Sequence, residues 1–181
     1  MVIKKLSTNQ IMTLSDFPVH NEQVLKLYHR MYWKGASLLV PPLPVVIIDK
    51  GQLELAGDSK EILQYNALLK KFLTKHPEVK YCFVDGSHKS TAAALCGKKI
   101  ASMILTTDED IKKARIMVEA GELFSLTTGG TNSIEDAIDI LRKNFLKAML
   151  FETVAEKTAR MVRANVVPKY MIKIYKTLKK V

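Results

Sequence analysis

Helical and strand-like patterns of apolar residues alternate along the first 106 residues. Apolar side chains recur every three or four residues over 21–34 and again over 59–75, which predicts two amphipathic helices. Four short runs predict strands: Val2–Leu6, Val45–Ile48, Val79–Val84 and Ile100–Leu105. The second run has four consecutive β-branched residues, which is typical of a strand buried on both faces. Because helices and strands alternate in this order, the sequence predicts an α/β fold.

After residue 106 the pattern is helical. Three acids at 108–110 favour the start of a helix, and Gly121 favours its end. A long helix is predicted from Ser133, and Pro168 divides the remaining C-terminal residues into two more helices. We therefore predict an α/β domain over 1–106 and a helical C-terminal extension over 107–181.

Positive charge is concentrated at the C-terminus. The chain has 28 Lys+Arg and 18 Asp+Glu, a net charge of +10. Residues 157–181 contain eight basic residues and no acid, so residues 1–156 hold 28 − 8 = 20 basic and 18 acidic groups, a net of +2. A surplus of this kind favours polyanionic partners but says little about the fold.

The last predicted helix is basic and amphipathic, because its apolar residues recur every three or four positions from Val167 to Val181. Three interpretations remain open: the helix docks on its own domain, binds a nucleic-acid backbone, or lies on an anionic membrane surface. A helix-turn-helix is weakly supported, since Asn165 and Pro168 occupy the place of the turn. The residues expected to contact nucleic acid are basic: Arg160, Arg163, Lys169, Lys173, Lys176 and Lys180.

Cysteine usage and the apolar runs indicate a cytoplasmic protein. Cys82 and Cys96 stand in apolar contexts without a CxxC pair, and we expect both to be buried, reduced thiols. The longest apolar run, 36–48, is interrupted by three prolines and is too short to cross a bilayer. We also expect Trp33 to be a core residue.

The most informative stretch is the strand at 79–84 followed at once by Asp85, Gly86 and an alanine-rich helix over 87–95. A helix N-terminus offers N–H groups and partial positive charge, and glycine allows a ligand to approach the backbone closely. The side chains of the first helical turn would add hydroxyl donors and positive charge: Ser87, His88, Lys89 and Ser90. The alternative is a capped helix whose polar first turn faces water, with Asp85 as an ordinary turn residue.

The segment VDGSHKSTAAALCGKKIASMIL resembles the signature of the ParB/sulfiredoxin superfamily, in which a strand, a Gly-x-His/Arg-Arg turn, an Ala-rich helix, a glycine and a strand follow one another. The upstream segment HNEQVLKLYHRMYWKGASLLVPPLPVVII resembles the family's opening, so the resemblance covers about 15–106. It implies a small mixed sheet with flanking helices. It also implies that Gly86, His88 and Lys89, with Ser87 and Ser90, bind nucleotide phosphates.

The branches of this family imply different activities. Ser87 stands where sulfiredoxins carry their catalytic cysteine, so thiol chemistry is not expected. The opening Pro18-Val-His-Asn-Glu22 is similar to that of the archaeal free serine kinases, with one extra residue before the glutamate. That similarity implies that Glu22 and Asp85 act on a substrate hydroxyl and on Mg²⁺. The chromosome-partition branch binds CTP, so across the family the expected nucleotide is ATP, ADP or CTP. Lys89 replaces the family's usual arginine and offers a point charge in place of a two-pronged donor.

We therefore expect a nucleotide-dependent, small-molecule phosphotransferase. The alternative is a ParB-like DNA-binding protein, of the partition or nuclease-like kind, that contacts DNA through its basic C-terminal helices. A third interpretation is an interaction module with an unused pocket, and a homodimer is left open. Two weaker candidates are His20, near the opening segment, and a second phosphate loop at Thr127–Thr131, which is more simply a flexible connection.

Overall fold

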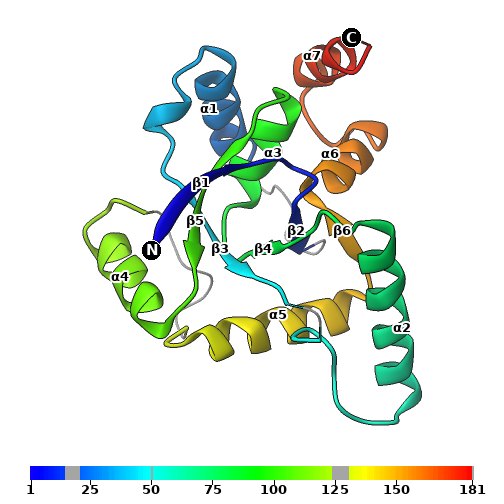
Figure 1. The fold of residues 1–181 in the computed structure, drawn as a ribbon. Coiled ribbons are helices and arrows are strands. Elements are labelled where there is room, and N and C mark those ends of the chain that lie inside the picture. The colour runs from blue at the N-terminus through cyan, green and yellow to red at the C-terminus, as the bar shows by residue number, and fades with distance from the viewer. Residues whose placement is uncertain (15–20, 50, 124–130, 181) are drawn as a thin grey trace.

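A computed structural model describes residues 1–14, 21–49, 51–123 and 131–180. Its strands are β1 (Val2–Leu6), β2 (Ile11–Leu14), β3 (Leu43–Ile47), β4 (Tyr81–Phe83), β5 (Ile100–Leu105) and β6 (Phe151–Thr153). Its helices are α1 (Glu22–Trp33), the short 3-10 helix η1 (Ser37–Leu39), α2 (Lys60–Lys75), α3 (Ser87–Leu95), α4 (Asp108–Glu119), α5 (Ile134–Ala148), α6 (Val154–Arg163) and α7 (Lys169–Leu178). Figure 1 shows these elements arranged around one sheet.

Within the described residues the strands form one mixed sheet in the order β1-β5-β3-β4-β2-β6. The pairs β5–β3 and β4–β2 are parallel, and the other three pairs are antiparallel. Val45 in β3 lies opposite Ile104 on one side and Phe83 on the other. The predicted α/β fold with a small mixed sheet and flanking helices is therefore confirmed.

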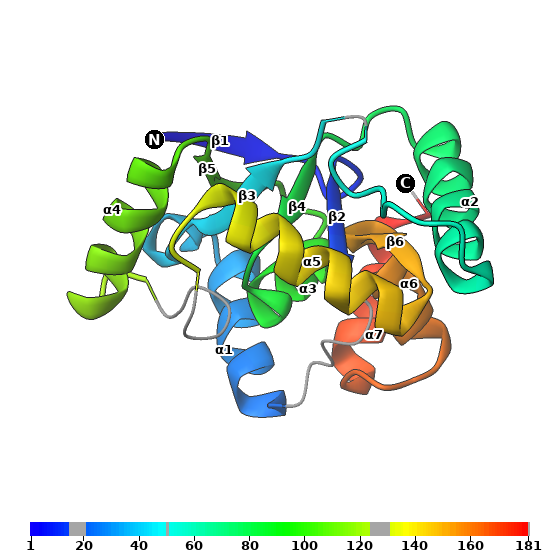
Figure 2. The same ribbon diagram turned by 90° about the horizontal axis from the view of Figure 1, so that it is seen from below.

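Helices cover both faces of the sheet. Successive strand residues point to opposite sides, and here both sets are apolar, so each face needs a layer of helices to bury it. Val45 and Phe83 pack in one core with α1, α3, α6 and α7, whereas Val46 and Cys82 pack in a second core with α2, α4 and α5. Figure 1 shows the two groups of helices on opposite sides of the sheet, and Figure 2 shows the same layers after a quarter turn. The buried side chains of α3 pack in the first core, and this packing fixes the position of α3 against the sheet.

Most predicted elements are present with small changes at their ends. The helix predicted over 59–75 is α2, whose first turn is capped by the Ser59 side chain at 3.3 Å from the Ile62 amide. Two helices flank Pro168, as the proline predicts. The expectation that Trp33 is a core residue is wrong: it lies at the end of α1, and 48% of it is exposed.

Two strands are absent from the sequence prediction. Residues 11–14 form β2 and residues 151–153 form β6, and the two pair antiparallel at one edge of the sheet. The division at residue 106 stays a prediction, although β6 follows that residue and joins the same sheet. Among the described residues, none of the helices combines the length and the apolar character that crossing a bilayer would need.

Candidate functional site

The candidate site is built where β4 runs into α3. Gly86 caps α3 with φ +113°, in the left-handed region, and a Cβ there would lie 1.9 Å from the Leu43 Cδ1 atom. The Gly86 carbonyl accepts the Ser90 amide at 2.9 Å, which closes the first turn. The missing side chain at the cap allows Leu43 to pack against the start of α3, whose free N–H groups carry partial positive charge.

Lys89 is the best-buried charged residue of the predicted set, with 4% of it exposed. Burial lowers the pKa of Lys89, and the negative charge of Asp85 opposes this effect. Burial, together with the same Asp85 charge, raises the pKa of Tyr28 in α1 to about 12. Asp85 therefore acts electrostatically on both helices that meet here, and Tyr28 remains a neutral hydroxyl at ordinary pH.

His88 connects α3 to the start of α1. Its Nε2 atom accepts the Asn21 amide at 3.1 Å, and the Asn21 side chain caps α1 by accepting the Val24 amide at 3.1 Å. A ring nitrogen that accepts an N–H bond is unprotonated, so His88 is neutral in this arrangement. The contact brings the N-termini of α1 and α3 together, and each of them carries partial positive charge.

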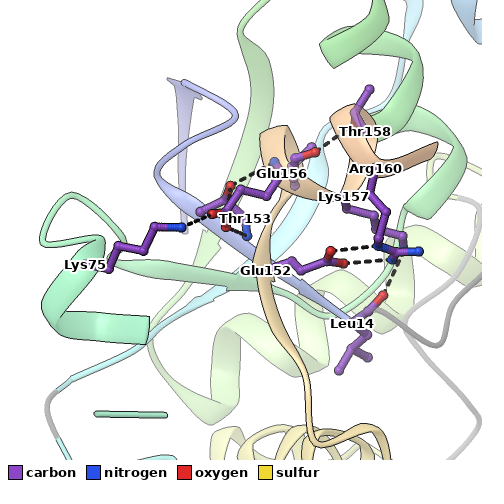
Figure 3. A network of polar contacts seen from close by, with 9 residues as sticks. Leu14, Lys75, Glu152, Thr153, Glu156, Lys157, Thr158 and Arg160 are labelled. Carbon is purple, nitrogen blue, oxygen red and sulfur yellow. Dashed lines mark hydrogen bonds and ion pairs between the residues drawn. The ribbon is translucent and has the colours of Figure 1, made fainter. Parts of the chain in front are cut away.

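Lys157 is a site residue that the sequence analysis does not identify. It lies in α6 with 3% of it exposed, and its Nζ atom donates to the Leu14 carbonyl at 2.8 Å and to the Ser87 hydroxyl at 3.3 Å. Figure 3 shows Lys157 reaching from α6 to the end of β2. Its partners are 143 and 70 residues away in sequence, so no local pattern could indicate this contact.

The start of α6 is held by two sets of polar contacts. A capping box joins Thr153 and Glu156 reciprocally, and Lys75 pairs with Glu156 at 2.8 Å. Arg160, one turn further along, binds both carboxylate oxygens of Glu152 at 2.7 and 2.8 Å (Figure 3). The cap therefore fixes the helix that carries Lys157.

Glu22 follows Asn21, the residue that contacts His88 at the start of α3. Its side chain is exposed and forms an ion pair with Lys26, one turn further along α1. Its predicted role on a substrate or metal stays a prediction. No group of three or more metal-ligating side chains occurs among the described residues. His20 and most of the loop at 127–131 lie outside those residues; Thr131, the described end of that loop, is buried.

The predicted nucleic-acid residues divide into two groups. The Arg160 guanidinium is held by Glu152, whose hydrogen bonds and charge raise its pKa above the ordinary value. The others are exposed: Arg163, Lys169, Lys173, Lys176 and Lys180. On α7 the opposite side, with Met171 and Ile172, is buried in the first core. The helix is therefore docked on its own domain and keeps its basic side in solvent.

The fold and the contacts at the start of α3 establish the structural class of this protein. It is an α/β protein in which the N-termini of α1 and α3 are joined by the Asn21–His88 contact, and in which the buried Lys157 reaches the first turn of α3 at Ser87. No family model, curated protein or solved structure matches the chain. The resemblance to the ParB/sulfiredoxin superfamily stays an expectation from the sequence.

Proposed function

We propose that the start of α3 binds the phosphates of a nucleotide, and that the protein transfers a phosphoryl group to a small hydroxyl-bearing substrate. The observation that carries this proposal is a helix start, capped by Gly86, that holds one buried lysine, Lys89, in its first turn and is contacted at the Ser87 hydroxyl by a second buried lysine, Lys157. Helix N-termini favour anions, and ammonium groups in a low-dielectric setting attract them more strongly than exposed ones. These features fit a phosphate group.

The proposed reaction assigns different tasks to the acidic residues. Asp85 would accept the proton of the substrate hydroxyl while the substrate oxygen forms a bond to the terminal phosphorus of the nucleotide. The bond between that phosphorus and the bridging oxygen breaks at the same time. The leaving nucleotide keeps that bridging oxygen and its charge. Glu22 would lie on the side of Mg²⁺, which, when bound, neutralises phosphate charge. The acidic roles rest on the family resemblance, whereas the phosphate site rests on the described geometry.

Calorimetry with ATP, ADP and CTP, with and without Mg²⁺, tests the binding step. The Lys89→Met variant removes the buried charge while keeping most of the side-chain volume, and Lys112→Met, an exposed lysine in α4, is the matched control. We expect the first variant to weaken nucleotide binding by about tenfold or more and the control to leave it unchanged. Binding of no nucleotide, or equal binding by both variants, would contradict the proposal.

The Asp85→Asn variant separates an enzyme from a binding module. If the protein is a phosphotransferase, this variant keeps nucleotide binding and loses most of the turnover, measured in the presence of candidate hydroxyl substrates as release of the nucleotide with one phosphate fewer (ADP from ATP, AMP from ADP or CDP from CTP). A wild-type protein that binds a nucleotide and does not shorten it with any of these substrates would contradict the phosphotransferase and leave the phosphate site standing.

A second candidate function is binding of a DNA backbone. It is favoured by the spacing of Lys169, Lys173 and Lys176, which places three exposed lysines on one side of α7. Phosphate contacts of this kind need charge and no base reading, so they are compatible with the absence of a predicted helix-turn-helix.

A further inference from the structure

A basic cavity lies at the opposite end of α3 from the candidate site. Its volume is about 290 Å³, and it is lined by residues of four segments: Ser7 and Thr8 after β1, Ala94, Gly97, Lys98 and Lys99 around the end of α3, Ala155 in α6, and Tyr175 and Lys179 at the end of α7. Lysines and hydroxyl groups therefore come together from segments far apart in the sequence. No carboxylate is among these described lining residues.

The cavity walls are set by close packing of α7 on α3. Gly97 follows α3 with φ +62°, and a Cβ there would lie 3.6 Å from the Leu178 Cδ1 atom. The Ala155 amide donates to the Thr8 carbonyl at 3.2 Å, which ties α6 to the turn after β1. The Lys179 ammonium lies 5.8 Å from the centre of the Tyr175 ring, within the range of a cation–π contact.

The positive charge at this cavity exceeds what the neighbouring helices require. The C-termini of α3 and α7 each carry a partial charge of about −0.5, so together they offset roughly one of the three lysine charges. Within the described parts of the chain, Lys98, Lys99 and Lys179 form no ion pair with a carboxylate. A net charge of about +2 is left at a concave surface that also offers two hydroxyl donors.

We propose that this cavity is a second anion-binding site, which takes one phosphate group between Lys98, Lys99 and Lys179. Ammonium groups and serine or threonine hydroxyls are donors suited to phosphate oxygens, and the cavity is large enough for a phosphate with part of the group that carries it. The phosphate can come from a free phosphorylated compound or from a nucleic-acid backbone that lies along the exposed lysines of α7. The site is independent of the one proposed at Gly86.

Titration of the full-length, ¹⁵N-labelled protein with pyrophosphate, followed by NMR, tests the site. We expect saturable shifts of the Ser7, Thr8 and Gly97 amides, because these line the cavity. The double variant Lys98→Ser/Lys179→Ser should weaken this binding about tenfold or more. The control Lys112→Ser/Lys113→Ser removes the same charge from exposed positions of α4 and should leave the affinity unchanged.

The two anion sites are distinguished by the Lys89→Met variant, which should leave the shifts at Ser7, Thr8 and Gly97 intact. Displacement of pyrophosphate from these amides by a short DNA duplex would identify a backbone phosphate as the ligand. Shifts that the duplex does not displace would identify a free phosphorylated compound. Equal pyrophosphate affinity in the two double variants, or no shifts at these amides, would overturn the proposal.

Discussion

Gly86 is the residue at which the backbone of the candidate site is most constrained. Its φ of +113° is unfavourable for any residue with a side chain, and the space that a Cβ would need is occupied by Leu43. We therefore expect Gly86→Ala to lower the free energy of unfolding by about 3 kcal/mol, from backbone strain and overpacking together. Urea denaturation of the full chain measures this loss.

Gly51→Ala is the matched control for that prediction. Gly51 also has a positive φ, of +93°, but nothing lies within 4 Å of the position of its Cβ. Only the backbone strain is expected there, about 1–2 kcal/mol. Equal losses at the two positions would show that Leu43 yields easily and that Gly86 is required only for its conformation.

His29 makes the stability of the molecule depend on pH. It belongs to α1 and packs against Tyr170 of α7, whose ring it meets edge-on at 5.6 Å. Only 2% of His29 is exposed, and its Nε2 atom has no hydrogen-bond partner in the described residues. Burial lowers its pKa below the ordinary value of 6.5. The unfolded chain therefore binds the proton more readily, so this contribution to stability is complete above pH 6.5 and is lost as the pH falls below it.

We expect the free energy of unfolding of the wild type to fall below pH 6.5 more steeply than that of His29→Phe, by up to about 1.4 kcal/mol per pH unit. Phenylalanine keeps an aromatic ring beside Tyr170 and has no proton to bind. Denaturant unfolding at several pH values between 5 and 8 provides the comparison. If the free energy of unfolding depends on pH in the same way for both proteins, the His29 Nε2 atom has a hydrogen-bond partner or water in solution and the prediction is wrong.

How much of the site could be predicted differs from residue to residue. Gly86 and the polar turn after it were accessible, because a strand, a glycine and a helix N-terminus are adjacent in sequence. The role of Lys157 could not be predicted, since no local sequence pattern shows that a lysine in a basic helix will be buried against Ser87. The neutral state of His88 also depends on a contact 67 residues away, with Asn21.

Among the elements, the long helices were predictable, whereas two of the short strands, β2 and β6, were not. The spacing of apolar residues identifies α2 and α5 over several turns, and their caps at Ser59 and Ser133 support it. β2 and β6 have four and three residues, too few to establish a period of two. Their conformation is set by pairing with each other across the sheet edge, which only the folded chain provides.

Helix α7 presents three exposed lysines on one side, at the spacing that a DNA backbone interface would use. The triple variant Lys169→Ser/Lys173→Ser/Lys176→Ser removes three charges from its exposed side, so the slope of log affinity for duplex DNA against log salt should become shallower by roughly 0.9 for each lysine that contacts a phosphate. Fluorescence anisotropy at several salt concentrations measures the slope.

The matched control removes Lys60, Lys70 and Lys71 from exposed positions of α2, which lowers the net charge equally. A backbone interface on α7 predicts that this control keeps the wild-type slope. The same change of slope in both triple variants would indicate a general effect of net charge, and an absent slope in the wild type would exclude binding to the DNA backbone.

For the whole molecule, both hydrophobic cores include residues from the predicted C-terminal extension. The first core takes side chains from α6 and α7, such as Met161 and Met171, and the second takes Ile138 and Phe145 from α5. Exposing each such side chain costs about 1.5–3 kcal/mol, whereas a domain is stable by only about 5–15 kcal/mol in total. The burial of side chains from residues after 106 therefore contributes more free energy than the total free energy of unfolding of a typical domain.

We accordingly expect residues 1–106, expressed alone, not to fold cooperatively. The measurement is the dispersion of amide resonances together with urea unfolding, and the full chain prepared in the same way is the control. A fragment with dispersed resonances and a sharp unfolding transition would contradict this expectation and would confirm the predicted boundary as that of an independent domain.

The strand order also determines when the sheet can be completed during synthesis. β1 is made first, yet its partner in the sheet is β5, at residues 100–105. β2 needs β4 and then β6, which ends at residue 153. The apolar residues of β2 consequently leave the ribosome long before their second neighbour exists, so one edge of this sheet stays open on the nascent chain until residue 153 has been made.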